Sequence, residues 1–367
     1  MKFTIARELL LKPLQLAAGV VERRQTLPVL ANVLLNLNDG VLRITGTDLE
    51  VEICGTVALS DAMAGGAITI PARKLLDICR SLPEGAEISL VVEADQRVKI
   101  QSGRSRFTLA ALPAEEFPEV EQEAASIAFR IAQNDLRKAL EATAFAMAQQ
   151  DVRYYLNGML WEIRPGLLRT VATDGHRLAR TDTPIAVSIE DRVQAILPRK
   201  AVNELSRLLS DGGEAEVMMG TNHLRVEGDG YRFTAKLVDG AYPDYERVIP
   251  AGGSRILEGD REALRQAFSR TAILSNEKYR GVRLELAGGR LRVAANNPEQ
   301  ESAEEEVSVV YDADHLEIGF NVGYLLDVLN ALPGTRVRFT LSDANSSVLL
   351  ADPEQINALY VIMPMRL

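Results

Sequence analysis

One stretch of the chain reads Leu168-Arg-Thr-Val-Ala-Thr-Asp-Gly-His-Arg-Leu178, and two related stretches occur elsewhere. An earlier copy reads Leu42-Arg-Ile-Thr-Gly-Thr-Asp48 and a later one reads Leu291-Arg-Val-Ala-Ala-Asn-Asn297, so the copies start 126 and 123 residues apart. In each copy, alternating apolar residues end in a polar turn, which is typical of a short β-strand.

The residues around each copy repeat at the same period. Before each copy, positions at spacing i, i+4, i+7, i+11 predict an amphipathic helix. These positions are Leu10, Leu14, Ala17 and Val21, then Leu136, Leu140, Thr143 and Met147, then Leu264, Phe268, Thr271 and Ser275. A second helix is predicted after each copy, starting at Pro71, Pro198 and Asn321, and Arg106-Phe-Thr-Leu109 matches Arg232-Phe-Thr-Ala235. Four elements in one order at one period predict three similar domains, 1–125, 126–250 and 251–367.

Each domain therefore combines two helices with several antiparallel strands, which predicts an α+β fold with the helices on one face of a sheet. Several details follow from local signals. We expect a helix at 8–21, in which Pro13 lies near the first turn or kinks the helix, a strand at 26–37, linkers at 113–126 and 248–259, and a surface loop at 180–193. Pro364 should end the pairing of the last strand and leave a free tail.

The bulk composition excludes several classes of protein. The chain of 367 residues has a net charge of −10 and two cysteines, Cys54 and Cys79, too few for a disulfide framework or a cysteine-based metal site. No apolar run has the length of a membrane span, and the first residues lack the apolar core of a signal peptide. We expect a cytoplasmic protein.

Enzyme signatures are largely missing from the sequence. Phosphate-loop, nucleophile-elbow and zinc-protease motifs are absent. Asp174 and His176 could form an acid/base pair, but a turn aspartate beside a hydrogen-bonding histidine explains them better. Asp312 and Asp314 fit a polar turn better than a metal site. We expect no cofactor and no metal.

Three groups of residues could instead bind partners. Basic positions on matching helices, Arg73, Lys74 and Arg80 with Arg199, Lys200 and Arg207, could contact phosphates without reading bases, or could be ordinary solvated faces. The segments 175–178, 242–248 and 363–367 could converge on an apolar ligand site where the second and third domains meet, or could be core. Arg104 and Arg106 are positively charged, whereas the segment 299–306 is rich in glutamate. These segments could close a head-to-tail ring, although from charge alone a solvated acidic loop explains those glutamates better.

Long motifs throughout the chain resemble one family. They are Phe3-Thr4, 26–28, 46–50, 71–74, 103–107, 150–159, 172–178, 236–240, 243–245, 272–278, 295–300, 319–322 and 361–367. These segments resemble the beta subunits of bacterial DNA polymerase III, the sliding clamps. The resemblance implies a non-catalytic, ring-shaped head-to-tail homodimer of three-domain chains around duplex DNA, which an ATP-driven clamp loader opens. The implied partners are the polymerase III catalytic subunit, the clamp loader, and other polymerases and repair proteins carrying clamp-binding peptides.

The resemblance also implies roles for individual residues. The DNA-facing set is Arg24, Arg73, Gln150, Tyr154, Tyr155, Arg199 and Lys200. The partner-peptide cleft set is Leu156, Thr173, Gly175, His176, Arg177, Leu178, Pro243, Arg247, Val248, Tyr279, Asn321, Tyr324, Ser347, Val361, Met363, Pro364, Met365 and Arg366, with Asn345 where an apolar residue is expected. The dimer set places Lys74, Arg104, Arg106 and Phe107 against Ile273, Leu274, Glu299, Glu301 and Glu304. The alternative from another class is a peptide-binding scaffold that does not encircle DNA.

Overall fold

The computed structural model describes residues 1–22, 27–60, 62–93, 95–118, 120, 123–355 and 357–366, with residues 62 and 63 described by their backbone alone. These residues divide into two compact units, each treated separately below. Unit 1 combines Met1–Asn134 with Lys200–Leu237, and unit 2 combines Asp135–Arg199 with Val238–Leu367.

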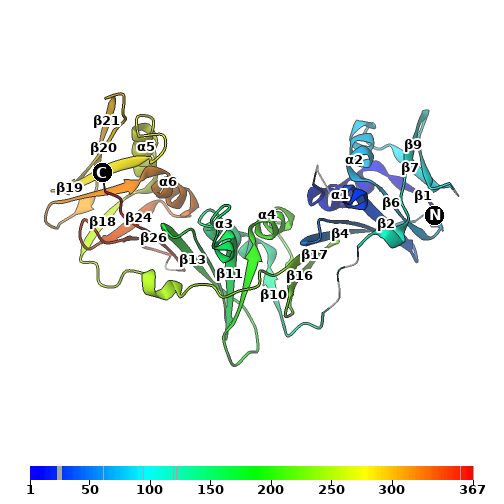
Figure 1. Ribbon diagram of the computed structural model, residues 1–367, viewed down its shortest axis with the longest axis horizontal. Helices are drawn as coiled ribbons and strands as arrows, with labels where there is room; N and C mark the ends of the chain where they lie inside the picture. The colour runs from blue at the N-terminus through cyan, green and yellow to red at the C-terminus, as the bar shows by residue number, and fades with distance from the viewer. Residues whose placement is uncertain are drawn as a thin grey trace. The chain divides into compact units, whose positions relative to one another are not determined.

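Unit 1 contains two antiparallel sheets (Figure 1). The first has the order β5-β1-β7-β8-β9, and the second has the order β10-β15-β16-β17-β4-β3-β2-β6. The strands of the first sheet are β1 (Lys2–Ala6), β5 (Ala62–Ala64), β7 (Glu87–Val92), β8 (Arg97–Ser102) and β9 (Ser105–Ala110). The strands of the second are β2 (Asn32–Asn38), β3 (Val41–Thr47), β4 (Val51–Ala58), β6 (Gly66–Pro71), β10 (Ile127–Ala132), β15 (Glu214–Met219), β16 (His223–Gly228) and β17 (Tyr231–Lys236).

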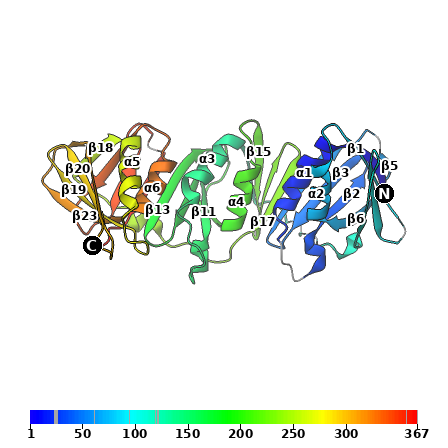
Figure 2. The same ribbon diagram turned by 90° about the horizontal axis from the view of Figure 1, so that it is seen from above.

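Helices α1 (Arg7–Gly19) and α2 (Ala72–Ser81) pack together over these strands, as Figure 2 shows. The approach of α1 is close enough to require glycine in the sheet, because a Cβ on Gly55 would lie 2.5 Å from the Pro13 side chain. Of the two alternatives for Pro13, the place near the first turn is wrong: Pro13 lies in the helix interior, and its buried ring packs on β4. Helix α4 (Arg199–Leu208) also belongs to unit 1, apart from its first residue.

Unit 2 contains a nine-stranded sheet, β14-β11-β12-β13-β26-β25-β24-β18-β22, and a four-stranded sheet, β21-β20-β19-β23. The first consists of β11 (Gly158–Arg164), β12 (Leu167–Thr173), β13 (Arg177–Pro184), β14 (Val193–Pro198), β18 (Arg255–Asp260), β22 (Val310–Tyr311), β24 (Arg336–Leu341), β25 (Val348–Ala351) and β26 (Ala358–Ile362). The second consists of β19 (Gly281–Ala287), β20 (Arg290–Asn296), β21 (Ser302–Ser308) and β23 (Leu316–Asn321). Its helices are α3 (Gln133–Ala144, from Asp135 onward), α5 (Arg261–Ala272) and α6 (Val322–Ala331), of which α5 packs on α6.

The internal repeat is confirmed element by element, and so is the α+β class. The three related strands, β3, β12 and β20, begin at Val41, Leu167 and Arg290, which preserves the spacing of the sequence copies. The predicted helix positions are all buried. Thr143 and Thr271 occupy equivalent buried positions, and each hydroxyl donates to the carbonyl four residues earlier, of Ala139 and Ala267, at 2.9 and 2.8 Å. Small polar residues therefore occupy the helix–sheet interface without unpaired groups.

Two pairings explain why residues 126–250 are divided between the units. Strand β17 pairs with β4, and β13 pairs with β26, so each half of the middle region extends a neighbouring sheet. The predicted boundaries at 125 and 250 remain predictions.

Four local predictions were wrong. The strand expected at 26–37 begins at Asn32, after a short 3-10 helix at Pro28–Ala31, because Pro28 favours a turn start. Pro71 precedes the first residue of α2 as its N-cap instead of being that residue. The loop expected at 180–193 is half strand, since β13 extends to Pro184 and pairs on both sides. The linker expected at 248–259 ends earlier, where β18 begins at Arg255.

The predicted free tail was also wrong. Pairing of β26 ends at Ile362 as expected, but the Met363 N–H donates to the His176 carbonyl and the Met365 N–H donates to the Gly319 carbonyl, each at 2.9 Å. Pro364 lies between these two residues and has no backbone N–H, so it needs no hydrogen-bond acceptor of its own. Within the described residues, no helix is long and apolar enough to cross a membrane.

Candidate functional site

The turn between β12 and β13 is built by its own side chains. Thr173 Oγ1 donates to the Arg177 carbonyl at 2.6 Å and accepts from the Gly175 N–H at 3.1 Å. Asp174 Oδ1 accepts from the N–H groups of His176 and Arg177 at 2.9 and 3.1 Å. Gly175 has φ +89°, which favours glycine. The Asp174 carboxylate is therefore already engaged by two backbone N–H groups and by the Arg177 side chain.

Arg177 joins this turn to α6 and to Phe145, the residue that follows α3. Its guanidinium contacts Asp174 Oδ2 at 3.1 Å, the Phe145 carbonyl at 2.6 Å and Asp327 Oδ2 on α6. It also stacks over the ring of Tyr324, 4.4 Å from the centroid. Because the side chain is 11% exposed, these contacts replace hydration that burial removed.

Beside the turn lies an apolar floor. It consists of Leu160, Val171, Leu178, Ile196, Tyr245 and Val361, with Tyr155, Tyr242 and Leu349 packed against it. Leu178 and Val361 are paired across β13 and β26. The Tyr242 hydroxyl accepts from the Thr173 N–H at 3.1 Å, and burial raises the pKa of that phenol. The six residues of the floor form a buried core cluster. Together with the turn, tail and helix around it, this cluster makes up the region where the partner-peptide cleft was predicted, and that region is called the cleft below.

The tail and the rim complete the cleft. Met363 is half exposed while its N–H is bonded to His176, so the thioether is presented beside the turn. Asn321 caps α6 by accepting from the Gly323 N–H at 2.8 Å and donates to the Tyr279 carbonyl at 3.3 Å. Tyr279 and Val248 are exposed large side chains, as a binding rim requires.

All the predicted cleft residues belong to unit 2, but they fall into different environments. Leu156, Leu178 and Val361 are buried, and Thr173, Arg177 and Tyr324 are half-buried around the turn. Pro243, Arg247 and Arg366 are exposed, and Arg247 forms an ion pair with Asp244 at 2.8 Å. Pro364, Met365 and Ser347 are half-buried, and Ser347 precedes β25, which pairs with β26. Asn345 is exposed in a turn held by Asp343.

Some cleft residues were missed from sequence. Phe145 and Asp327 hold Arg177, and neither has a local motif. Asp327 follows Tyr324 by three residues, so a helical wheel of α6 would have placed both on one face. Tyr155, predicted to face DNA, is half-buried and packs in part against the apolar floor.

The predicted DNA-facing residues of unit 1 differ in their surroundings. Arg73 is exposed and forms no ion pair with a described residue. Lys200 Nζ contacts Glu22 Oε1 at 2.6 Å, Asp48 Oδ2, and the Val20 carbonyl at 3.4 Å. Burial opposes its charge, but the hydrogen bonds to Asp48 and Glu22 prevail and raise the pKa of Lys200. Arg24 lies outside the described residues.

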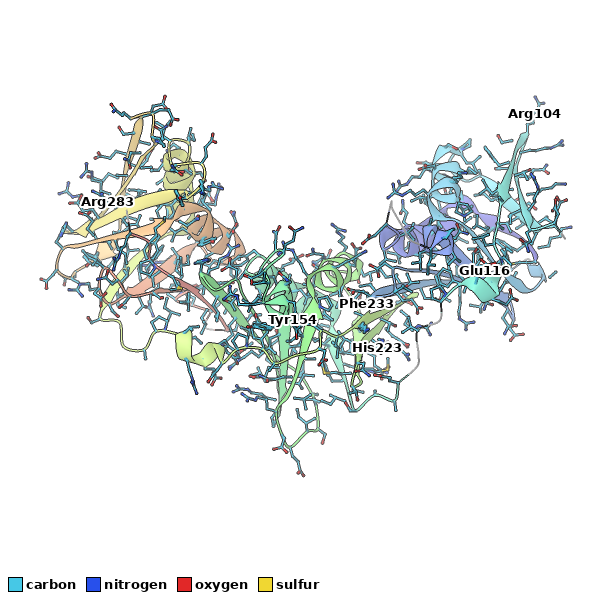
Figure 3. All side chains as sticks on the ribbon, viewed as in Figure 1. Arg104, Glu116, Tyr154, His223, Phe233 and Arg283 are labelled. Atoms are coloured by element: carbon cyan, nitrogen blue, oxygen red, sulfur yellow. The ribbon has the colours of Figure 1, made fainter. Side chains whose placement is uncertain are left out.

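The predicted DNA-facing residues of unit 2 lie after α3 and at the start of α4. Gln150 is exposed with φ +55°, and Tyr154 is 57% exposed (Figure 3) with its ring edge-on to Tyr155 at 5.8 Å. Arg199 donates to the Met147 carbonyl at 2.9 Å, and burial lowers its pKa. Val152, which no prediction included, is 95% exposed beside them.

The predicted dimer residues lie on two sheet edges or close to them. In unit 1, β9 is an edge strand, and Arg104 lies in the turn that precedes it (Figure 3). On β9 itself, Arg106 is exposed and Phe107 is half-buried. In unit 2, β21 ends its sheet and carries Glu304, which contacts Arg292 at 2.6 Å. The remaining members, Lys74, Ile273, Glu299 and Glu301, are exposed, Ile273 by 75%, and Leu274 is half-buried. The acidic run is thus largely a strand and not the loop considered from sequence.

In the described part of the chain, no group of three or more His, Cys, Asp or Glu side chains is arranged to hold a metal ion.

Comparisons with known proteins point in one direction. Three family profiles match, described as the DNA polymerase III beta subunit N-terminal domain over residues 1–121, central domain over 130–244 and C-terminal domain over 246–366. The chain is 58% identical to the beta sliding clamp of Pseudomonas aeruginosa and 52% identical to that of Escherichia coli, each match covering 100% of both proteins.

Solved structures agree with these matches. A P. aeruginosa sliding clamp bound to griselimycin superposes with a TM-score of 0.98 at 58% identity, covering 100% of both chains. The Caulobacter crescentus beta sliding clamp superposes with a TM-score of 0.94 at 40% identity, covering 100% of this chain and 99% of that one.

Proposed function

This chain belongs to the DNA polymerase III beta subunit family, and from that premise we propose that it is a sliding clamp of DNA replication. It encircles duplex DNA as a head-to-tail homodimer and tethers the replicative polymerase. A topological link lets contact with DNA stay weak while residence stays long, and the tether raises the local concentration of polymerase. The clamp loader and other polymerases and repair proteins bind through the same cleft.

The arrangement of the turn, the tail and the apolar core beneath them is the observation that supports this function. An apolar floor, a rigid turn and an anchored but half-exposed methionine tail together offer a binding site for a short peptide with apolar side chains. The predicted cleft residues, from Leu156 to Arg366, are proposed to act there. Arg177 is a positioning residue, because it fixes the turn against α6.

The open edges support closure by a second copy. Within the chain, the last strand of one repeat pairs with the fourth strand of the preceding one: Arg232 faces Cys54, and Leu359 faces Arg180. Thr45, Val171 and Ala294 occupy the same position in the three copies of the repeated strand. The residues that face them on the fourth strand, Cys54, Arg180 and Glu304, are therefore equivalent to one another. Strand β9 is the last strand of the first repeat and β21 is the fourth strand of the third repeat, and among the described strands each lies at the edge of its sheet, unpaired on one side.

The same repeat supplies the register of the proposed dimer. Arg106 is equivalent to Arg232, so it would face Glu304 of the second copy, with Phe107 facing Ala303. This places opposite charges across the new ladder. Ile273 and Leu274 would cover the apolar side, and Arg104 would lie opposite Glu306 in this register. Lys74, Glu299 and Glu301 are proposed as further members of the interface.

The remaining assignments are proposals of the same kind. The domains span 1–125, 126–250 and 251–367. Arg24, Arg73, Gln150, Tyr154, Tyr155, Arg199 and Lys200 face DNA and contact phosphates. The protein acts in the cytoplasm and catalyses no reaction; in support, the Asp174 carboxylate is already engaged by the backbone of the turn and by Arg177.

Retention on circular and linear DNA tests the clamp function. The protein is loaded by its clamp loader onto nicked circular DNA, filtered at high salt, and the circle is then cut. We expect the protein to stay on circles and to leave linear ends. Equal loss from both shapes would favour the second candidate, a peptide-binding scaffold that does not encircle DNA. The ion pairs that occupy Lys200 are the observation in favour of that candidate.

Removing the tail tests the cleft separately. A chain ending at Ile362 loses the two backbone hydrogen bonds of Met363 and Met365 and the exposed thioether. We expect polymerase affinity to fall by at least about tenfold, the equivalent of about 1.4 kcal/mol, while loading on circular DNA at high protein concentration persists. Unchanged affinity for the polymerase would refute the assignment of the cleft.

A further inference from the structure

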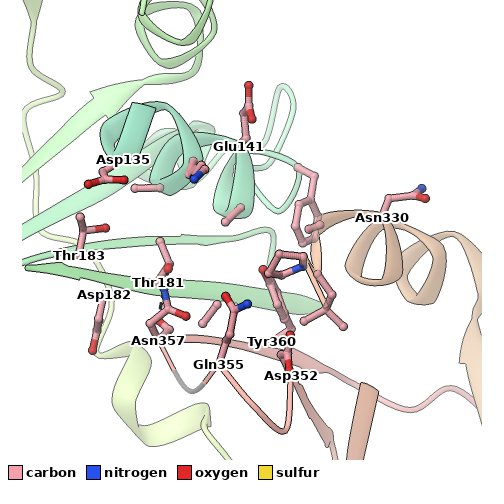
Figure 4. A pocket seen from close by; sticks show the side chains of 18 of the residues that line it. Asp135, Glu141, Thr181, Asp182, Thr183, Asn330, Asp352, Gln355, Asn357 and Tyr360 are labelled. Carbon is pink, nitrogen blue, oxygen red and sulfur yellow. Dashed lines mark hydrogen bonds between the residues drawn. The ribbon is translucent and has the colours of Figure 1, made fainter. Parts of the chain in front are cut away.

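Unit 2 has a pocket at the other end of the two strands that form the cleft. Strands β13 and β26 run antiparallel, with Arg177 facing Ile362 at the cleft and Thr181 facing Ala358 at the pocket. The pocket, drawn in Figure 4, has a volume of about 730 Å³ and is lined by α3, the last residues of β13, the end of α6 and the segment before β26. Its volume is in the usual range for small-molecule sites.

Two buried polar groups that line this pocket lack partners. Tyr360 is 0% exposed and Asp352 is 3% exposed, and neither Tyr360 Oη nor Asp352 Oδ2 has a hydrogen-bond partner among the described residues. The other carboxylate oxygen of Asp352 accepts from the Glu354 N–H at 2.8 Å. Unpaired buried groups of this kind are costly and usually indicate a missing partner.

The position of Asp352 is fixed by the backbone around it. A Cβ on Gly334 would lie 2.1 Å from Asp352 Oδ2, so only glycine leaves room for the carboxylate there. The carboxylate is thus held in one place by the Glu354 amide and by the glycine that follows α6.

The charge of the lining favours a cation. Five carboxylates line the pocket, of which Asp182 is bound to Arg169 and Asp327 to Arg177. Asp135, Glu141 and Asp352 remain against a single amine, Lys138, and Glu141 has only a distant contact with Arg137 at 3.9 Å. Figure 4 shows Asp135 and Glu141 coming from α3.

The rest of the lining favours an apolar body on that cation. The rings of Phe145 and Tyr360 lie 5.8 Å apart, and Ala139, Ala142 and Leu332 add aliphatic surface. Aromatic faces and carboxylates together attract organic cations. A metal ion fits less well, because the described residues offer no cluster of three or more metal ligands.

We propose that this pocket binds an organic cation with an apolar body, an amine, amidine or guanidine, whose N–H groups bond Asp352 Oδ2 and Tyr360 Oη. The site is separate from the cleft and does not depend on the proposed function.

Calorimetric titration of the full-length protein tests the proposal with benzamidine as the probe and benzamide as its neutral counterpart of the same shape. We expect benzamidine to bind and benzamide to bind at least about tenfold more weakly, the difference that one charge-assisted hydrogen bond supports. Asp352→Asn keeps the acceptor for the Glu354 amide and should weaken benzamidine about tenfold. Tyr360→Phe should weaken it severalfold.

Glu354→Gln is the matched control, because this exposed carboxylate is two residues from Asp352 and does not line the pocket; its affinity should equal that of the unaltered protein. Equal binding of benzamide and benzamidine would show a purely apolar pocket, and absence of binding at millimolar benzamidine would show a pocket filled by water. Either result overturns the proposal. If Asp352→Asn fails to fold, Tyr360→Phe and the benzamide comparison still decide the outcome.

Discussion

At the scale of single residues, Arg177 has the most consequences. Its guanidinium connects the β12–β13 turn, the Phe145 carbonyl and Asp327, and it covers the Tyr324 ring. Truncation would leave Asp174 and Asp327 without their cation and open a gap beneath Tyr324. The turn and α6 would then be free to separate, so this one side chain links stability to the shape of the cleft.

Arg177→Ala should lower the free energy of unfolding by about 2 to 3 kcal/mol, less than for a fully buried pair because Asp327 is 43% exposed. Urea unfolding measures this change, and peptide binding should weaken in parallel. Arg283→Ala is the matched control, since its ion pair with Glu317 is about half exposed on both sides and should matter little. Equal effects of the two substitutions would contradict the role given to Arg177.

Asp151 gives a prediction about pH. Hydrogen bonds from the Arg153 side chain and backbone N–H lower the pKa of Asp151 to about 2, against its usual 3.8. Because the folded pKa lies below the unfolded one, the contribution of this turn to stability is present above pH 3.8 and is lost as pH falls through about 2.

Carboxyl carbon NMR titration should therefore give a midpoint for Asp151 near 2, and Arg153→Ala should shift it toward 3.8. A midpoint near 3.8 in the unaltered protein would show that the Arg153 contact does not persist in solution.

At the scale of elements, the contact of α1 with β3 and β4 depends on two glycines. A Cβ on Gly46 would lie 2.0 Å from the Ala17 carbonyl oxygen, and one on Gly55 would meet Pro13. These are backbone or ring contacts that cannot rotate away, so the helix itself would have to move.

Gly46→Ala should destabilise the protein by about 2 kcal/mol, in the range of overpacked cores. Gly212→Ala is the control, because no atom lies within 4 Å of the added carbon and its φ is not positive, so its unfolding midpoint should stay the same or rise slightly. Unfolding by urea compares the two. A Gly46 variant as stable as the control would mean that α1 is not held as closely as described.

Elements also show where prediction from sequence succeeded and failed. The helices with buried residues at Leu10, Leu136 and Leu264 were predicted because an amphipathic helix carries its burial pattern within itself. Strand β13 was missed because Arg180 and Asp182 look like loop residues. Asp182 is in fact bound to Arg169 of the neighbouring strand at 2.7 Å, a pairing that no local pattern records.

At the scale of the whole molecule, the exposed Ile273 and the open edges β9 and β21 favour assembly with a second copy. Ile273→Ala with Leu274→Ala should leave a folded monomer, measured by sedimentation, since both changes remove apolar surface without touching either strand. A double variant that still sediments as a dimer would contradict the assigned interface.

The register of that dimer can be tested by a disulfide. Arg106 facing Glu304 places Thr108 opposite Ser302, and opposed residues on paired strands lie within the Cα range of a disulfide. A chain with Thr108→Cys and Ser302→Cys should form a covalent dimer on oxidation, seen on a non-reducing gel. The pair Thr108→Cys with Glu306→Cys, displaced by roughly 13 Å along the strand, should not. Cys54 and Cys79 are buried and should not interfere.

The sequence by itself determined the threefold repeat, the helix faces, the polar turn after the repeated strand and the charges of the two edges, because each is encoded in neighbouring residues or in one period. Only the tertiary structure decided what depends on distant partners. It extended β13, anchored the tail on His176 and Gly319, paired Lys200 with Glu22 and Asp48, and left Asp352 and Tyr360 without partners in a pocket. The physical reason is that these features depend on hydrogen bonds and ion pairs between segments far apart in the chain. Such partners produce no periodic pattern in the sequence of either segment.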